Sequence, residues 1–167
     1  MRKVLLFATM SIMLFSCSNT EKQEKTITND MEDAKTWGTA SLVVKDVAHS
    51  GVYSCKLDSA HIYSAGVQSA FKKILNVLPK EVKVKVWVYS FQPDPDATIV
   101  LSVSNNGQTK YWKNSALLGV KNAKEWTEVN AFFELPANLD INDEVSVLVW
   151  NPNKQNLYID DLDVSFE

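Results

Sequence analysis

Histidine and cysteine are scarce in this chain, with two residues of each type among 167. The sequence therefore offers no cluster of the side chains that hold zinc. It has no glycine-rich loop of the kind that binds phosphate, and no serine or cysteine stands in a nucleophile motif. It also has no basic cluster, and a formal net charge of −3 gives it no electrostatic reason to bind nucleic acid. These absences predict a protein that is neither an enzyme nor a nucleic-acid binder.

The longest apolar run is too short to cross a bilayer, which takes about 20 residues. This run, at residues 4–15, follows Arg2 and Lys3 and has the form of an export signal. It ends in Leu-Phe-Ser-Cys at 14–17, and a small residue directly before a cysteine resembles the lipobox of bacterial lipoproteins. In that family the signal is cut before the cysteine, here Cys17, which is then acylated. The alternative is an ordinary secretory signal with a cysteine there by chance.

The lipobox divides the chain into a signal peptide at 1–16, lipidated Cys17 with a flexible tether up to residue 29, and one domain at 30–167. Residues 18–29 are polar and cannot bury enough apolar surface to offset chain entropy. Acyl chains would supply the membrane affinity, at roughly 0.8 kcal/mol per buried CH₂. Cys55 is then left without a partner and is predicted to be a small buried apolar residue.

Removal of the signal takes away two basic residues and no acid, which leaves 15 basic and 20 acidic residues and a net charge of −5. The charged tether resembles those of Bacteroidetes lipoproteins sent to the outer face of the outer membrane. We therefore predict an anchor in the outer membrane, and the sequence leaves open which face of that membrane the domain occupies.

The domain is predicted to be all-β. Residues 82–89 alternate strictly between valines and larger residues, the period of a half-buried strand. Asn105-Asn106-Gly107 tolerates the positive φ of a tight hairpin. Val77 and Pro79 argue against a helix at 70–78. Further strands are expected at 98–104, 108–113, 126–135, 145–149 and 157–166, and shorter ones near 40–45, 52–58 and 66–74. About ten short strands with Gly, Pro and Asn turns favour a β-sandwich jelly roll.

Four motifs occur along the domain in a familiar order: Met31-Glu32-Asp33, Ala48-His49-Ser50-Gly51-Val52-Tyr53-Ser54, Trp126-Thr127-Glu128-Val129 and Tyr158-Ile159-Asp160-Asp161-Leu162. Together they resemble the galactose-binding-like jelly roll, close to the carbohydrate-binding modules of families 4, 9 and 22. Met31 and Leu162 depart from the usual Phe and Val. The resemblance covers about residues 30–167 and implies a domain that binds carbohydrate without cleaving it.

The first and last motifs also suggest a metal site. If the first and last strands lie side by side, the carboxylates of Glu32 and Asp160 meet and repel each other unless a cation separates them. Backbone carbonyls near Asp30 and around Ser50 would complete a Ca²⁺ site, and the family resemblance implies a structural calcium. The alternative is that both carboxylates are solvated or hydrogen-bonded to backbone at strand ends.

Aromatic residues are the candidates for the ligand site. Trp87 and Tyr89 lie on the face of their strand opposite the valines, Trp112 follows the hairpin, and Trp37 lies in an early loop. A flat ring offers an apolar platform for a sugar, and polar neighbours such as Lys85 would bind the hydroxyls. The alternative is that these rings cover the second face of the sheet beneath loops.

Two groups of acidic residues, Asp94 with Asp96 and Asp140 with Asp143 and Glu144, form the case for an enzyme. Glycosidases use paired carboxylates, but acids beside Pro and Asn are expected to be solvated turn formers. A smaller feature, Asp58-Ser59-Ala60, resembles the O-glycosylation sequon of exported Bacteroidetes proteins.

The sequence thus predicts a lipid-anchored jelly roll that binds an oligo- or polysaccharide. The alternative is an envelope scaffold or protein–protein interaction lipoprotein that uses the aromatic face as its contact surface. An open groove with exposed aromatics would favour a glycan, and a flat apolar patch would favour a protein partner.

Overall fold

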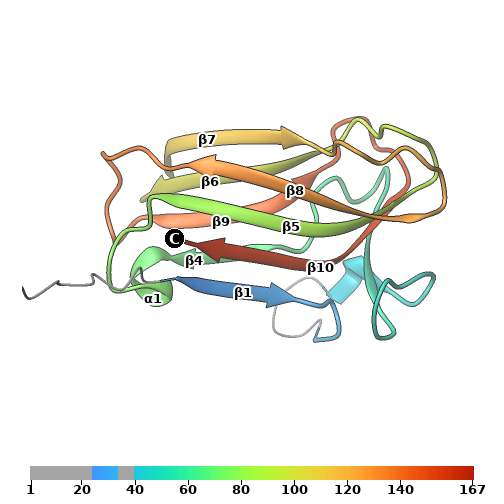
Figure 1. Cartoon of the computed structure of the whole chain (residues 1–167), viewed down its shortest axis with the longest axis horizontal. Coiled ribbons are helices and arrows are strands. Elements are labelled where there is room, and N and C mark those ends of the chain that lie inside the picture. The colour runs from blue at the N-terminus through green and yellow to red at the C-terminus, as the bar shows by residue number, and fades with distance from the viewer. Residues whose placement is uncertain (1–23, 34–39) are drawn as a thin grey trace, which may run out of the picture.

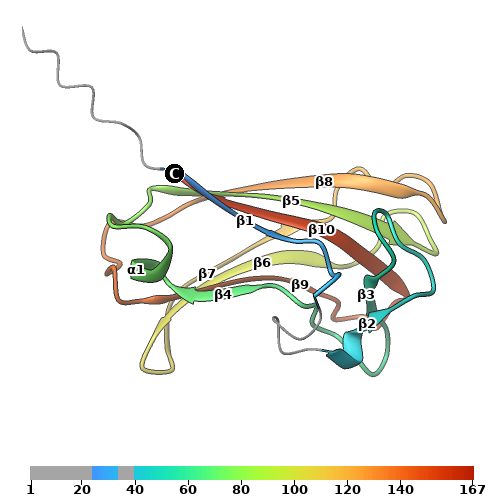
Figure 2. The same cartoon turned by 90° about the horizontal axis from the view of Figure 1, so that it is seen from below.

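Two antiparallel sheets face each other in the computed structural model, which describes residues 24–33 and 40–167 (Figures 1 and 2). The described residues form ten strands, one 3₁₀ turn, η1 (Ala40–Leu42), and one short helix, α1 (Phe71–Ile74). The prediction of an all-β sandwich with about ten strands is confirmed. Within the described segments, no helix is long and apolar enough to span a bilayer.

Sheet A, the larger sheet, is built around the last strand of the chain. Its strand order is β2 (Val43–Val44), β3 (Ser54–Leu57), β10 (Leu157–Phe166), β5 (Glu81–Ser90) and β8 (Trp126–Glu134). The strand β1 (Lys25–Asn29) pairs with the second half of β10, beyond the part that β3 covers. Sheet B has the order β4 (Val67–Ala70), β9 (Glu144–Trp150), β6 (Thr98–Asn105) and β7 (Gln108–Ala116).

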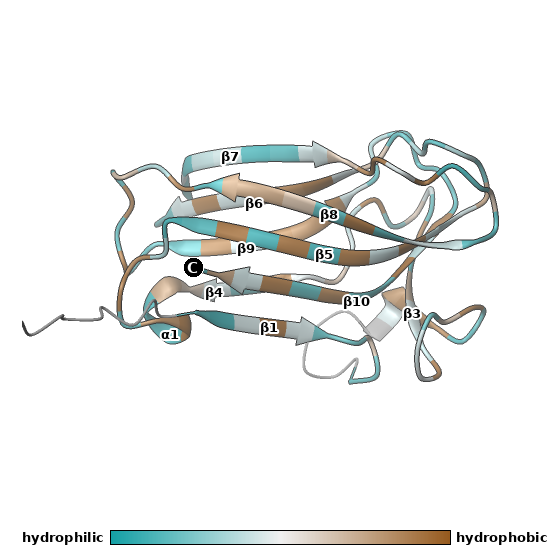
Figure 3. Cartoon of the chain, viewed as in Figure 1, coloured by the Kyte–Doolittle hydropathy of each residue, from teal (hydrophilic) through white to brown (hydrophobic). Residues whose placement is uncertain are grey.

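The core lies between the sheets because the strands alternate as predicted. The four valines of β5 at 82–88 and the three of β9 at 145–149 are at most 2% exposed. Figure 3 shows the resulting apolar bands along β5 and β10. Each fully buried aliphatic side chain contributes about 1.5–3 kcal/mol. Cys55 lies in this core, where burial raises the pKa of its thiol to about 11, so the prediction of a buried apolar cysteine is confirmed.

The folded domain begins earlier than the sequence predicted. Lys25 to Asn29, which we expected to belong to the tether, pair with β10 in antiparallel register, with Lys25 opposite Phe166 and Asn29 opposite Leu162. This strand has one aliphatic side chain, Ile27, packed against the core. It is held mainly by backbone pairing, which apolar content does not reveal, and the boundary at residue 30 was therefore wrong.

One local backbone feature follows the sequence closely, one departs from it, and a third was not predicted. Asn106 and Gly107 both have positive φ, 48° and 77°, in the hairpin between β6 and β7, as the Asn-Gly pair predicted. The segment 70–78, where we expected no helix, contains the single turn α1, closed by a bond from Leu75 N to Phe71 O of 2.9 Å. A β-bulge interrupts β10 between Asp160 and Asp163.

The bulge places the two neighbouring aspartates differently. Asp161 has a φ of 45° and takes up the extra residue, so Leu162 returns to the core. Asp160 is paired with Trp87 and so shares the outward face of sheet A with it, yet it is fully buried. A turn of the chain must therefore cover this part of the sheet.

Candidate functional site

Face A, the outward face of sheet A, carries Trp87 and Tyr89, as the alternation predicted. The ring of His49 stacks on Trp87, with centroids 3.8 Å apart and planes 15° apart. Tyr89 contacts Trp126 at 5.5 Å, and Phe91 and Tyr158 at 5.8 and 6.0 Å. These rings, which we call the aromatic cluster of face A (His49, Trp87, Tyr89, Phe91, Trp126 and Tyr158), pack on one another rather than facing solvent separately.

Asp160 holds the turn that brings His49 onto Trp87. Its Oδ2 accepts the backbone N–H of His49 at 2.8 Å and of Ser50 at 3.3 Å, and its Oδ1 accepts that of Asp161 at 2.8 Å. Burial raises the pKa of this carboxyl to about 6, although the backbone hydrogen bonds act in the opposite direction. Asp161 ties down the same turn, since its carboxylate bonds His49 Nδ1 at 2.6 Å and accepts the Ser50 hydroxyl at 2.8 Å.

Glu32 binds the other half of the same turn. Its Oε1 accepts the backbone N–H of Val52 at 2.7 Å and of Tyr53 at 2.8 Å. Gly51, at a φ of 57°, makes this approach possible, since a Cβ there would lie 2.4 Å from Glu32 Oε1. The Asp30 carboxylate accepts the N–H of Glu32 at 3.1 Å. The first and last motifs therefore converge on the turn at residues 48–53, as the sequence suggested.

The predicted calcium site is left open by this geometry. The groups that face the carboxylates of Glu32 and Asp160 are backbone N–H donors, whereas a Ca²⁺ ion would need further oxygen ligands beside them. In the part of the chain that the structure describes, no group of three His, Cys, Asp or Glu side chains is arranged to hold a metal ion. The hydrogen-bonded alternative accounts for both carboxylates as they stand, and calcium stays a prediction.

Face B, the outward face of sheet B, carries aromatic rings that are less covered. Trp112 is 47% exposed and Tyr63 is 52% exposed. Tyr63 lies beside Trp150, with ring planes 16° apart and centroids 6.5 Å apart. This spacing is much wider than that of His49 on Trp87, so the two rings form a paired surface without burying each other's faces.

Polar and aliphatic side chains occupy face B between Trp112 and the Tyr63–Trp150 pair. Strand register places Trp112 opposite Ser102, Ser102 opposite Ser146, and Ser146 opposite Gln68, so one row crosses the whole sheet. In the next row, Val100 stands opposite Leu148 and Asn114. From the rise and spacing of strands, Trp112 and Trp150 lie roughly 16 Å apart, which is longer than one sugar ring.

Gly66 helps to shape this face. A Cβ at Gly66 would lie 2.1 Å from the carbonyl oxygen of Val147, so only glycine lets this segment approach β9. Tyr63, three residues before Gly66, forms a bridge with Trp150 at the end of the same strand. Tyr63 could not be identified from the sequence, because it precedes a strand of four residues, which is too short to show an alternation.

The predicted ligand residues do not form one site. Trp87, Tyr89 and Lys85 lie on face A, whereas Trp112 lies on face B, across the thickness of the sandwich. Trp37 lies outside the described residues, as does Cys17. Lys85 lies on the same side of β5 as Trp87, two residues away, and its amine pairs with Asp163 at 2.7 Å.

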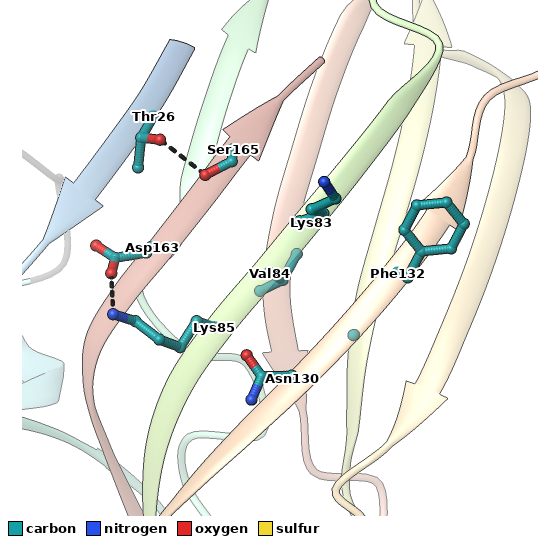
Figure 4. Close-up of a pocket in the computed structure, with 9 residues that line it drawn as sticks. Thr26, Lys83, Val84, Lys85, Asn130, Phe132, Asp163 and Ser165 are labelled. Carbon is teal, nitrogen blue, oxygen red and sulfur yellow. Dashed lines mark hydrogen bonds and ion pairs between the residues drawn. The ribbon is translucent and has the colours of Figure 1, made fainter. Parts of the chain in front are cut away.

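Phe132 was not among the predicted residues, although it is 52% exposed on face A. It borders a groove of about 570 Å³ that is lined by residues of β1, β10, β5 and β8 (Figure 4). The signal was present in the sequence, because Phe132 is an apolar residue on the polar side of an alternating strand.

One acidic group differs from its prediction. Asp143, expected to be a solvated turn former, is fully buried. It accepts hydrogen bonds from Lys110 Nζ at 2.7 Å and from Asn105 Nδ2 at 2.7 Å. Burial alone would raise the pKa of Asp143, but these bonds bring it below its ordinary value. Asp143 thus fastens the β6–β7 hairpin to the start of β9, whereas Asp94 and Asp96 are exposed as expected.

Similarity to known proteins is found among solved structures. No protein-family model and no curated protein matches the sequence. A similar solved structure is the CBM22-2 xylan-binding domain from Paenibacillus barcinonensis Xyn10C, with 17% identity and a TM-score of 0.50 over 75% of this chain and 85% of that chain. Others are a family 16 carbohydrate-binding module (15% identity, TM-score 0.45, 73% and 82% covered) and a family 4 module (14%, 0.44, 85% and 86%). The chain has the β-sandwich fold of carbohydrate-binding modules.

Proposed function

We propose that the domain binds a neutral oligo- or polysaccharide on face B and does not cleave it. The observation that carries the proposal is the exposure of Trp112 and Tyr63 on one face of sheet B. On the same face, Ser102, Ser146 and Gln68 continue the row of Trp112 across the neighbouring strands. Exposed rings of this kind stack on the C–H faces of sugars, and hydroxyl and amide groups bond the sugar hydroxyls. A structure of the same fold that is described as xylan-binding supports this ligand class.

Face B replaces the aromatic cluster of face A as the proposed platform. His49 stacks on Trp87 at van der Waals distance, so a sugar could reach that indole only if the turn at 48–53 moved. Such a movement would break the hydrogen bonds that Asp160 and Glu32 make to the turn, each worth about 0.5–1.5 kcal/mol. Tyr63 and Trp112 need no such rearrangement.

Isothermal titration of residues 18–167 with neutral xylo-oligosaccharides tests the proposal. Trp112→Ala and Tyr63→Ala should each weaken binding by about 2 kcal/mol, or roughly thirtyfold in Kd, because both rings are contact platforms. Their melting temperatures should change little, because half-exposed rings contribute little to folding.

Phe91→Ala is the matched control, since Phe91 is 45% exposed but lies on face A. It should leave the affinity unchanged. Wild-type affinity in folded Trp112→Ala and Tyr63→Ala variants would refute face B as the site. If a glycan array showed no saccharide binding, the envelope-scaffold alternative would take the place of this proposal.

We further propose that the protein is exported and anchored in the outer membrane through acylated Cys17. The support is the sequence at 1–17, a charged start and an apolar run that ends in Ser-Cys. Cys17→Ala should move the protein from the detergent phase to the aqueous phase in detergent-phase partitioning of whole cells. Equal partitioning of the variant and the wild type would rule out the lipid anchor.

A further inference from the structure

The groove on face A is built from two rows of side chains, and four strands contribute to each row in the order β1, β10, β5 and β8. One row is Thr26, Ser165, Lys83 and Phe132, and the other is Thr28, Asp163, Lys85 and Asn130. All of them except Thr28 line a space of about 570 Å³ (Figure 4). Small-ligand sites measure about 300–1,000 Å³, so the groove is large enough to hold such a ligand.

Phe132 supplies the apolar wall of this groove. It is 52% exposed, and no ring contact involves it within the described segments. Its register partner is Lys83, and Asn130 lies two residues away on the same side of β8. The ring is therefore available to stack on a ligand, in contrast to Trp87 under His49.

The polar side chains that line the groove are joined in donor–acceptor pairs. These are Thr26 with Ser165 at 2.7 Å, Lys85 with Asp163 at 2.7 Å, and Asn130 with Glu128 at 2.9 Å. Such pairs keep further bonding capacity, because an ammonium group has three donors and a carboxylate about four acceptor sites. A hydroxyl both donates and accepts hydrogen bonds, so a sugar hydroxyl can bond both members of a pair.

Carboxylates outnumber ammonium groups around the groove. The two lysines that line it, Lys83 and Lys85, are both paired already. The carboxylates beside them are those of Glu81 and Glu167 at Lys83, and those of Asp163, Glu128 and Asp161 at Lys85. An anionic ligand gains no net attraction from this arrangement. A neutral ligand with many hydroxyl groups fits it, because it needs donors and acceptors but no excess of either charge.

We propose that this groove is a second saccharide site, and that it takes a neutral sugar ring. Phe132 stacks on the C–H face of the ring, and the pairs of Thr26 with Ser165 and of Lys85 with Asp163 bind its hydroxyls. The groove offers one exposed aromatic ring where face B offers two, so it is the weaker site. The groove site stands apart from face B, but one consequence rests on the proposed function: with both sites, the domain holds two glycan chains on opposite faces.

Titration of residues 18–167 with xylotriose, followed at each backbone amide by NMR, tests this site. We expect two separate groups of shifted amides, a tighter-binding one around Trp112 and a weaker one around Phe132 and Asn130. Phe132→Ala should weaken binding at the groove about tenfold or more and leave face B unchanged, because it removes the only ring that the groove lining offers. Trp112→Ala should do the reverse.

Trigalacturonate, in which each sugar ring carries a carboxylate, tests the assignment to a neutral ring. It should shift the amides around Phe132 less than xylotriose does at the same concentration, because the carboxylates around the groove repel it. A stronger response to trigalacturonate than to xylotriose would overturn the neutral assignment.

Phe91→Ala is the matched control, because Phe91 is a similarly exposed phenylalanine of face A that does not line the groove. It should leave xylotriose binding at both sites unchanged. Absence of amide shifts around Phe132, or equal shifts there in the wild type and the folded Phe132→Ala variant, would overturn the groove site whatever happens on face B. Absence of shifts around Trp112 alone would refute the proposed function and leave the groove site standing.

Discussion

The two outward faces of the sandwich both carry aromatic rings, and the rings differ between the faces in how much of them is covered. On face A, the rings of the aromatic cluster contact one another, and the turn at 48–53 covers Trp87. On face B, Tyr63 and Trp112 keep about half of their surface exposed. The availability of a ring for ligand is therefore set by what the rest of the chain lays over it, and the side of the strand to which it belongs is not enough.

The packed rings of face A contribute to stability, whereas the exposed rings of face B are available for binding. Aromatic pairs contribute about 0.5–1.5 kcal/mol each beyond the area they bury, so the aromatic cluster of face A acts as a small second core outside the sandwich. Among the described residues, face B has one ring pair, with centroids 6.5 Å apart, and its exposed rings add little to folding. Mutations on the two faces should accordingly be read by different measurements.

Among the changes to face A, removal of β1 should cause the largest loss of stability. A chain that begins at residue 30 loses five paired residues and the packing of Ile27. We expect a loss of about 3 kcal/mol or more in the free energy of unfolding, from net hydrogen bonds of about 0.5–1.5 kcal/mol each and buried aliphatic surface. Urea unfolding of chains that begin at residues 24 and 30 measures it.

The same truncation removes Thr26 from the lining of the groove on face A and removes no residue of face B. Xylo-oligosaccharide binding on face B should survive wherever the shortened chain is folded. Equal unfolding midpoints for the two chains would mean that residues 25–29 are a tether, as the sequence alone suggested.

Calcium is predicted to bind at Glu32 and Asp160, beneath the turn at 48–53 on face A, and so to stabilise the fold from that face. An ion that binds the folded state alone stabilises it by about 2.7 kcal/mol at a hundred times its dissociation constant. Melting curves with calcium and with chelator should then differ for the wild type and coincide for Glu32→Gln and Asp160→Asn, while Glu134→Gln, at an exposed position of β8, behaves as the wild type.

The stability should depend on pH in opposite directions with and without calcium. Without metal, the pKa of about 6 for Asp160 lies above its ordinary value of 3.8. Its stabilising contribution is then complete below about pH 4 and is lost as pH rises through 6. Calcium needs the ionised carboxylate, so the stabilisation by calcium should instead grow as pH rises through 6. A stability that is identical with calcium and with chelator at pH 7.5 would dismiss the metal site.

Trp87→Ala should lower stability and leave affinity unchanged, the opposite of what we expect for Trp112→Ala and Tyr63→Ala. The indole is packed between His49 and the sheet, so we expect a loss of about 2 kcal/mol in the free energy of unfolding, below the 3–5 kcal/mol of fully buried aromatics. Affinity for neutral xylo-oligosaccharides should not change. Reduced affinity in a Trp87→Ala variant that melts like the wild type would return the binding site to face A.

His49→Ala should have the smallest effect. It removes one stacked pair and one hydrogen bond to Asp161, with an expected cost of about 1 kcal/mol. Trp87 should become more accessible, which iodide quenching of tryptophan fluorescence detects. His61→Ala is the control, because His61 pairs with Asp58 and its ring contacts no other described ring. Unchanged quenching in His49→Ala would show that the turn itself, and not the imidazole, covers the indole.

Most of the fold could be read from the sequence because its strands alternate cleanly. The valines of β5 and β9 identify the core, and Asn106-Gly107 identifies a hairpin. β1 could not be read in this way, since one aliphatic residue among polar ones gives no apolar period. Its position depends on backbone groups of β10, more than 130 residues later in the sequence.

The sites were harder to predict for two physical reasons. Alternation correctly placed Trp87 on the outward side of its strand, but it does not say which sheet a strand joins, so Trp87 and Trp112 could not be assigned to different faces. Coverage of Trp87 depends on Asp160, which lies 111 positions from His49. Asp143 escaped prediction for the same reason, since the cation that pairs with it, Lys110, comes from the neighbouring hairpin.

The pairing of Lys25 with Phe166 brings the start of β1 and the end of β10 to one end of the sandwich, where α1 also lies (Figure 1). Phe71 of α1 bonds Asp143, directly before β9, so β9 runs away from this end and finishes at Trp150, which bridges to Tyr63. The eight residues from Cys17 to Glu24 span at most about 28 Å. If Cys17 carries the proposed acyl anchor, the end of the sandwich where Lys25 and Phe166 pair stays within about that distance of the membrane surface. The Tyr63–Trp150 pair, at the other end of the sandwich, would then be the part of the domain that can reach farthest from the membrane.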